Sequence, residues 1–127
     1  MDFKQFLKGL QAIVGEQNVV YHSDDLLVFE YDGSVDRGMP DAVVFPSSAH
    51  EVSQIIKLSR RAGVPVVGRG TGTGLSGGAI TAPGGIQVAF PRMNHILEVD
   101  TENRLALVEP GVINLDLDTH VRKFGLR

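Results

Sequence analysis

The glycine-rich segment from residue 68 to residue 85 is the part of this sequence whose residue types and spacing could do chemistry. Eight of the 15 glycines of the chain fall in this segment. Alternate glycines let a backbone approach a ligand closely, and successive N–H groups in such a loop can converge on anionic oxygens. Thr71, Thr73 and Ser76 add hydroxyl donors, and Arg69 adds a positive charge. The segment therefore predicts a loop that binds a phosphate or a pyrophosphate. A glycine-rich surface loop without a ligand is the alternative reading.

Two familiar phosphate-binding motifs do not fit this segment. Residues 72–77 spell G-x-G-x-x-G, but a dinucleotide fingerprint of that form must open a crossover helix whose N-terminus faces the pyrophosphate. The residues that follow, 78–85, hold three glycines and Pro83, which is too broken a stretch for such a helix. A P-loop would need a Lys-Ser or Lys-Thr pair after its last glycine. We therefore expect backbone amides and hydroxyls alone to hold the phosphates.

Composition excludes several other function classes. The chain has no cysteine, which rules out disulfides, thiolate metal sites and cysteine nucleophiles. Its net charge of −3 argues against nucleic acid as a partner. No apolar run approaches the roughly 18 residues of a membrane span, and the N-terminus does not read as a signal peptide, so we expect a cytoplasmic protein. The four histidines are scattered without metal-ligand spacing. We predict no metal site and name no catalytic residue.

Hydrophobic periodicity and capping residues predict the elements that position the glycine-rich segment. In order, they are a helix over 3–14, a short helix opened by Asp24-Asp25 and running through Leu27 and Phe29, a strand over 42–45, a helix over 49–62 with a Ser48–Glu51 capping box, strands over 64–68, 86–90, 96–100 and 104–109, and a helix from Asn114 to Gly125. Residues 42–68 predict a parallel, right-handed strand–helix–strand unit. Residues 96–109 predict an antiparallel hairpin. The strand over 64–68 delivers the chain into the glycine-rich segment.

Four motifs in one order carry a resemblance to a known family. They are Pro-Asp-Ala-Val-Val-Phe-Pro at 40–46, the helix that begins at Glu51-Val52, the run from Gly68 to Ala79, and Val-Glu-Pro-Gly-Val at 108–112. Together they resemble the start of the FAD-binding domain of the vanillyl-alcohol oxidase type, in the branch with the glycolate oxidase FAD subunit and FAD-dependent D-lactate dehydrogenases. The resemblance covers roughly residues 20–127.

The resemblance implies a fold and a set of cofactor-binding residues. The fold would be α/β (α+β), the first subdomain of such an FAD-binding domain, with a small mixed sheet flanked by helices. Residues 1–40 would be a helical lead-in, and residues 41–127 the first FAD-binding subdomain. The implied FAD-binding residues are Pro46, Arg69, Gly70, Thr71, Gly72, Thr73, Gly74, Leu75, Ser76, Gly77, Gly78, Ala79, Pro110 and Gly111. Since no histidine lies between residues 51 and 94, we expect non-covalent FAD.

The activity that the resemblance implies is the oxidation of a small 2-hydroxy acid, of the glycolate or D-lactate type, by hydride transfer to FAD. It leaves room for an electron-acceptor subunit and, through that partner, for peripheral association with the inner membrane. We expect a second subdomain and a substrate cap downstream, so that these 127 residues alone would be inactive. They would also expose an apolar face and an open strand edge, which favour dimerisation or poor solubility. Within the same fold, a sugar nucleotide, an aromatic alcohol or an ether-lipid precursor is the alternative substrate. Two alternative functions also stay open: a non-catalytic nucleotide- or phosphate-binding module, and a fragment of a split flavoprotein.

Overall fold

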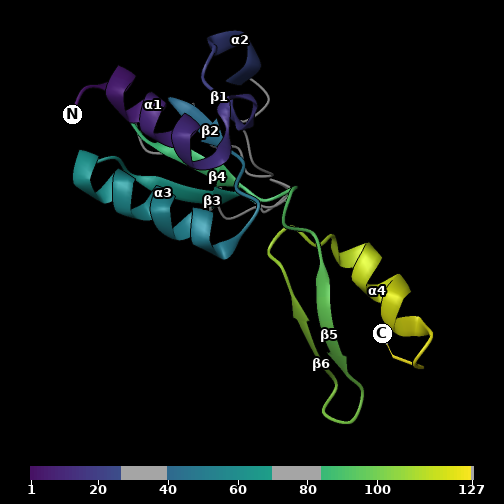
Figure 1. The fold of residues 1–127 in the computed structure, drawn as a ribbon. Helices are drawn as coiled ribbons and strands as arrows, with labels where there is room; N and C mark the ends of the chain where they lie inside the picture. The colour runs from purple at the N-terminus through teal and green to yellow at the C-terminus, as the bar shows by residue number, and fades with distance from the viewer. Residues whose placement is uncertain (27–39, 70–83, 127) are drawn as a thin grey trace.

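A four-stranded sheet forms the centre of the computed structural model, which describes residues 1–26, 40–69 and 84–126. Its spatial order is β1 (Val19–Val20), β2 (Ala42–Val44), β4 (Ile86–Ala89) and β3 (Val66–Arg69) (Figure 1). Strands β2 and β3 both run parallel to β4, and β1 runs antiparallel to β2. All four residues of β4 are buried, as expected for a strand with a neighbour on each side and covered faces.

Two helices cover one face of this sheet. Helix α1 (Phe3–Val14) and helix α3 (Ala49–Ala62) lie side by side on it (Figure 1). A short 3-10 turn, η1 (Glu16–Asn18), links α1 to β1. The core between the helices and the sheet consists of Phe6, Leu10, Val14, Val19, Ala42, Val44, Ile55, Leu58, Ile86 and Val88. Residues that follow the 3.6 period of the helices thus meet alternate residues of the strands.

The other face of the sheet packs a smaller cluster. Val43 and Ala89 contact Leu26 of helix α2 (Ser23–Leu26). Leu26 ends the first described stretch, so the predicted continuation of this helix through Leu27 and Phe29 lies outside the described residues. Strand β1 and helix α1 come from the predicted lead-in, yet both pack into the same core as the sheet of residues 41–127.

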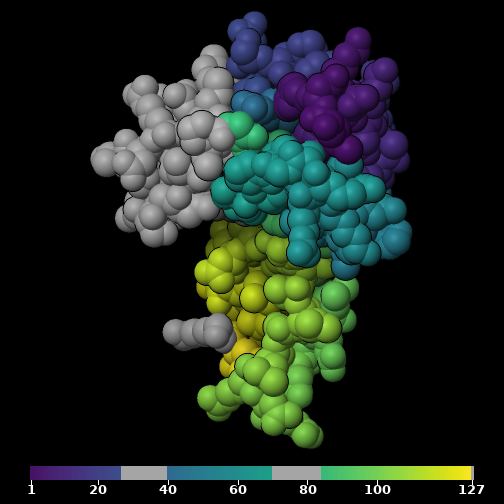
Figure 2. Space-filling view, turned by 90° about the vertical axis from the view of Figure 1, so that its left-hand side faces the viewer, coloured from purple at the N-terminus to yellow at the C-terminus, as the bar shows by residue number. Residues whose placement is uncertain are grey.

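A hairpin and the last helix form a separate layer. Strands β5 (Ile96–Asp100) and β6 (Leu105–Val108) pair antiparallel in their own two-stranded sheet, and helix α4 (Asn114–Arg122) follows. The hairpin projects away from the main sheet (Figure 1), and in Figure 2 these segments form the lower part of the molecule, beneath the teal helix α3. At its tip, hydrogen bonds from the side chain and backbone of Asn103 lower the pKa of Asp100.

Three leucines of this hairpin are exposed. Leu97, Leu105 and Leu107 are 60%, 63% and 58% exposed. Leu107 stands opposite Glu98, whereas the Val99–Ala106 pair points to the opposite side of the ribbon, towards α4. Asp100 and Glu98 pair with Leu105 and Leu107, so this side of the ribbon is mixed in character. The apolar face expected for a missing subdomain, and the dimerisation expected from it, stay predictions.

Most predicted elements are confirmed, and several details differ. Strand β3 spans Val66–Arg69 rather than 64–68, and β1 is not among the predicted strands. Strand β4 lies between β2 and β3, so the predicted strand–helix–strand unit is parallel but its strands are not neighbours. Helix α4 ends at Arg122, three residues before the predicted glycine. The capping box is half formed: the Ser48 hydroxyl accepts from the Glu51 amide, but the Glu51 carboxylate accepts from the amide and hydroxyl of Ser47. Ser47 presents two donors to one charged acceptor, which outweighs the single Ser48 amide.

Adjacent isoleucines of α3 provide a test of the core. Ile55 is fully buried against α1 and the sheet, whereas Ile56 is 44% exposed. Ile55→Ala should lower the free energy of unfolding by about 2–5 kcal/mol, because it leaves a cavity. Ile56→Ala, the matched control, should change it by only about 0.5 kcal/mol. Denaturant unfolding of the purified proteins measures both; equal losses would contradict the described packing.

Candidate functional site

The candidate site lies where the three parallel strands end. Because β2, β4 and β3 are mutually parallel, their carboxyl ends meet at one edge of the sheet. Phe45 and Pro46 follow β2, Arg69 is the last residue of β3, and Phe90 follows β4. Ligands of open α/β sheets bind in the crevice outside the carboxyl ends of the strands. Two of the predicted binding residues, Pro46 and Arg69, thus lie at the edge where a ligand is expected.

A pocket of about 460 Å³ opens at this edge. Its lining comes from the residue after β2, from the end of β4 with the turn that follows, and from the segment between β6 and α4. The lining residues are Phe45, Ala89, Phe90, Pro91, Asn94, Ile96, Pro110, Gly111, Val112, Ile113 and Asp116. Two more predicted binding residues, Pro110 and Gly111, therefore form part of its wall. Most of the lining is apolar and would suit a flat, uncharged ring.

Gly111 brings two turns into backbone contact. Its N–H donates to the carbonyl of Met93 at 2.8 Å. A Cβ at position 111 would stand 1.8 Å from the carbonyl oxygen of Phe90, far inside van der Waals contact. The turn after β6 can therefore lie against the turn after β4 only with glycine at this position. The pocket owes the placement of its Pro110–Gly111 wall to this contact.

Arg92 links the exits of two strands. Its Nη1 donates to the carbonyl of Phe45 at 2.6 Å, across 47 residues of sequence. Phe45 in turn donates its N–H to Asn18 next to β1. The chain segments that leave β2 and β4 are thus held together beside the pocket. Sequence analysis did not single out Arg92, because its partner is a backbone carbonyl that no side-chain pattern reveals.

Glu109 and His95 form a pair at the base of the hairpin. The Glu109 carboxylate accepts from the His95 amide at 3.1 Å and also contacts ring Nδ1 of His95. The Glu109 amide donates to the His95 carbonyl at 2.9 Å. The sequence analysis assigned His95 no role, and its side chain is 70% exposed. The signal that could have found the pair is the hairpin itself, because pairing Ile96 with Val108 sets residues 95 and 109 opposite each other.

The described residues fit a ligand that has both an anionic part and a flat apolar part. Arg69 brings a positive charge to the end of β3, one strand away from the apolar pocket beside β4. The predicted donor loop, Gly70 to Ala79, lies outside the described residues. Within residues 1–26, 40–69 and 84–126, no cluster of metal-ligating side chains forms. In the same ranges no helix is long and apolar enough to cross a bilayer.

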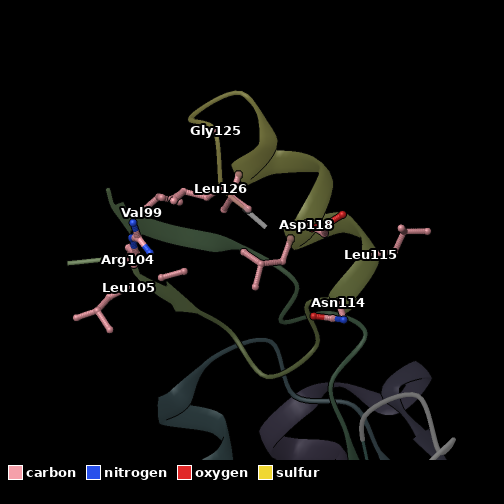
Figure 3. A pocket seen from close by; sticks show the side chains of 11 residues that line it. Val99, Arg104, Leu105, Asn114, Leu115, Asp118, Gly125 and Leu126 are labelled. Atoms are coloured by element: carbon pink, nitrogen blue, oxygen red, sulfur yellow. The ribbon is translucent and has the colours of Figure 1, made fainter. Parts of the chain in front are cut away.

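A larger pocket, of about 850 Å³, lies between the hairpin and α4 (Figure 3). Val99 and Ala106 form its hairpin side, and Leu117, Val121 and Leu126 form its helix side. Asp118 at its rim pairs with Arg122 at 2.8 Å, while Leu115 points away from the hairpin in Figure 3. None of the predicted binding residues that the structure describes lines this pocket. Size alone therefore does not locate the site.

Comparison with known proteins relates this chain to flavoproteins. The family described as "FAD binding domain" matches residues 40–127. The glycolate oxidase subunit GlcD of Bacillus subtilis (strain 168) is 40% identical over 124 residues, which cover 97% of this chain and 26% of that protein. The D-lactate dehydrogenase of Anaerostipes hadrus is 31% identical over 98% of this chain and 25% of its own length. A structure of p-cresol methylhydroxylase superposes with a TM-score of 0.84 at 24% identity, over 98% of this chain and 25% of that one. The chain spans about a quarter of the length of each.

Gly111→Ala tests the backbone contact at the pocket. The added methyl must displace the Phe90 carbonyl or the 109–112 turn, so the free energy of unfolding should fall by about 1–3 kcal/mol. Gly68→Ala is the matched control, because a Cβ there would meet only the Phe90 ring, at an ordinary 3.6 Å. Thermal or denaturant unfolding compares the two. A Gly111→Ala protein as stable as the Gly68→Ala protein would contradict the close approach.

Proposed function

This chain belongs to the FAD binding domain family, and we propose that it is the cofactor-binding part of a dehydrogenase that oxidises a small 2-hydroxy acid to a 2-oxo acid. Its relatives are flavin oxidoreductases that include a glycolate oxidase subunit and a D-lactate dehydrogenase. FAD is the cofactor of this family. The small mixed sheet flanked by helices that the sequence predicts is confirmed by the likeness to p-cresol methylhydroxylase.

One observation carries the proposal. Pro46, Arg69 and the Pro110–Gly111 turn come from three separate parts of the chain, and all lie at or beside the carboxyl edge of the parallel strands. In the proposed assignment, residues 69–79 line the pyrophosphate of FAD. Pro46 lies beside the cofactor, and Pro110 with Gly111 closes over it. A single crevice at this edge would serve all three segments.

The chain would contribute binding, orientation and exclusion of water. Arg69 would offset the negative charge of the pyrophosphate, and the apolar residues around Phe90 and Val112 would cover a ring system. Bound FAD supplies the hydride-accepting chemistry. No histidine lies between residues 51 and 94, which supports non-covalent attachment. The proposal places no catalytic residue in this chain.

The names of the relatives support a substrate class and a partner for the proposal. The names of two of them, a glycolate oxidase subunit and a D-lactate dehydrogenase, favour glycolate or D-lactate. Because the first of these is named as a subunit, we include an electron-acceptor subunit in the proposal. We place the protein in the cytoplasm, with attachment to the inner membrane only through such a partner. Residues 41–127 would then be the first FAD-binding subdomain of a longer enzyme.

The full-length gene product gives the direct test. It should purify with a flavin absorption spectrum that survives gel filtration, and acid precipitation should release the flavin into the supernatant. Glycolate or D-lactate should bleach the flavin under anaerobic conditions and reduce an artificial electron acceptor, while L-lactate serves as the stereochemical control. A protein that neither contains nor binds FAD would refute the proposal. A flavoprotein that no 2-hydroxy acid reduces would refute the substrate class alone.

Arg69 provides a site-specific prediction. Arg69→Gln should weaken FAD binding by about 10- to 100-fold, because a charge-assisted hydrogen bond contributes about 1.5–3 kcal/mol. Arg61→Gln is the matched control, since Arg61 is an exposed cation in the last turn of α3. Fluorescence titration of the FAD-free protein measures both affinities. Equal affinities for the two variants would remove Arg69 from the proposed site.

A further inference from the structure

We propose that Glu109 is a positioning residue for the bound cofactor: by holding His95 it sets the place of the Pro110–Gly111 wall. This inference rests on the proposed function, because it assigns a role within the same cofactor site. Glu109 is not one of the predicted FAD-binding residues. It would act through Pro110 and Gly111, the two residues that follow it. We call the Glu109–His95 pair the clasp.

The clasp closes the base of the hairpin. Three interactions join its two residues: the amide of each residue is bonded to the other residue, and the Glu109 carboxylate meets the His95 ring. The Glu109 side chain is only 17% exposed. The clasp lies next to the Ile96–Val108 pair, at the end of the hairpin where β5 and β6 join the rest of the chain. The Glu109 carboxylate binds both the amide and the ring of His95. It thus adds a side-chain interaction that ordinary cross-strand pairs lack.

Each partner of the clasp is one residue away from the pocket wall. Asn94 precedes His95, Pro110 follows Glu109, and both line the 460 Å³ pocket. Beyond Pro110, the Gly111 amide is held by Met93 and the Val112 amide returns to the Glu109 carbonyl. The proline ring fixes one backbone angle between these anchors. The Pro110–Gly111 wall is therefore held by the clasp on one side and by the Gly111–Met93 hydrogen bond on the other.

The hairpin depends on the clasp because its strands make no hydrogen-bonded pair with the main sheet among the described residues. Strands β5 and β6 pair only with each other among the described residues. A two-stranded hairpin by itself is marginally stable in water. Its orientation therefore depends on the turns at its base, and the Glu109 carboxylate is a side-chain contact made at that base. Loss of the clasp should let the hairpin tilt and take the Pro110–Gly111 wall with it.

The test compares two substitutions at one position. Glu109→Ala removes the acceptor for His95, whereas Glu109→Gln keeps an oxygen that can accept from the His95 amide and an NH₂ group that can face the ring. Asp118→Ala is the control, because it breaks a carboxylate–cation pair in α4, at the other pocket. The measurements on the full-length gene product are FAD affinity, quenching of bound-flavin fluorescence by iodide, and thermal stability.

Glu109→Ala should bind FAD about tenfold or more weakly, the loss that corresponds to hydrogen bonds of a charged group. Its bound flavin should also become more accessible to iodide. Glu109→Gln should restore both values to within about threefold of the parent, and Asp118→Ala should leave both unchanged. His95→Ala removes only the ring contact and should give an intermediate loss, so it decides the matter if Glu109→Ala does not fold.

Three outcomes would overturn the inference. Parent-like affinity and iodide access in Glu109→Ala would do so. Equal losses in Glu109→Ala and Asp118→Ala, in step with thermal stability, would assign the residue a general structural role. Failure of Glu109→Gln to restore binding would show that the charge, rather than the position of the wall, matters. In each of these the parent still binds FAD; a parent that does not bind FAD would instead refute the proposed function.

Discussion

The contact of the Gly111 backbone with the Phe90–Met93 turn is the constraint on which the rest of the site depends. It joins the hairpin layer to the sheet layer by main chain rather than by side chains. Only hydrogen fits at the α-carbon, because any Cβ would stand 1.8 Å from the Phe90 carbonyl oxygen. The Gly111–Met93 hydrogen bond and the Glu109–His95 clasp hold the same turn from its two ends. The pocket at the carboxyl edge exists because these two turns approach so closely.

The main sheet provides the rigid side of that pocket. Strand β4 is fully buried between β2 and β3, with α1 and α3 over one face and α2 on the other. Parallel strands end at one edge of the sheet, and Arg92 links the segments that follow β2 and β4. Pro46 and Arg69, two described residues of the proposed site, thus lie at the ends of strands anchored in a packed core. Such segments hold geometry better than long free loops.

The comparisons separate fold from chemistry. The p-cresol methylhydroxylase structure shares the fold at 24% identity, whereas the glycolate oxidase subunit GlcD is 40% identical to this chain over 124 residues. One fold therefore serves proteins whose names point to different substrates, and function has to be argued from the site. The features that this chain contributes are a crevice at the strand ends and a glycine-rich segment that leaves β3. In the proposed function both features serve the cofactor.

The elements themselves were readable from local patterns: glycine ends α1 and α3, serine caps α3, and two alternating runs around Asn103 form the hairpin. The four family motifs likewise identified the FAD-binding class, because Pro46, Arg69 and Pro110–Gly111 are recognised by residue type and order. Only the tertiary structure decided that β4 inserts between β2 and β3, that Arg92 bonds the Phe45 carbonyl, and that Gly111 lies on the Phe90 carbonyl. Those are contacts with backbone atoms distant in sequence. Because a backbone carbonyl is chemically the same at every residue, side-chain patterns cannot predict which carbonyl will be the partner.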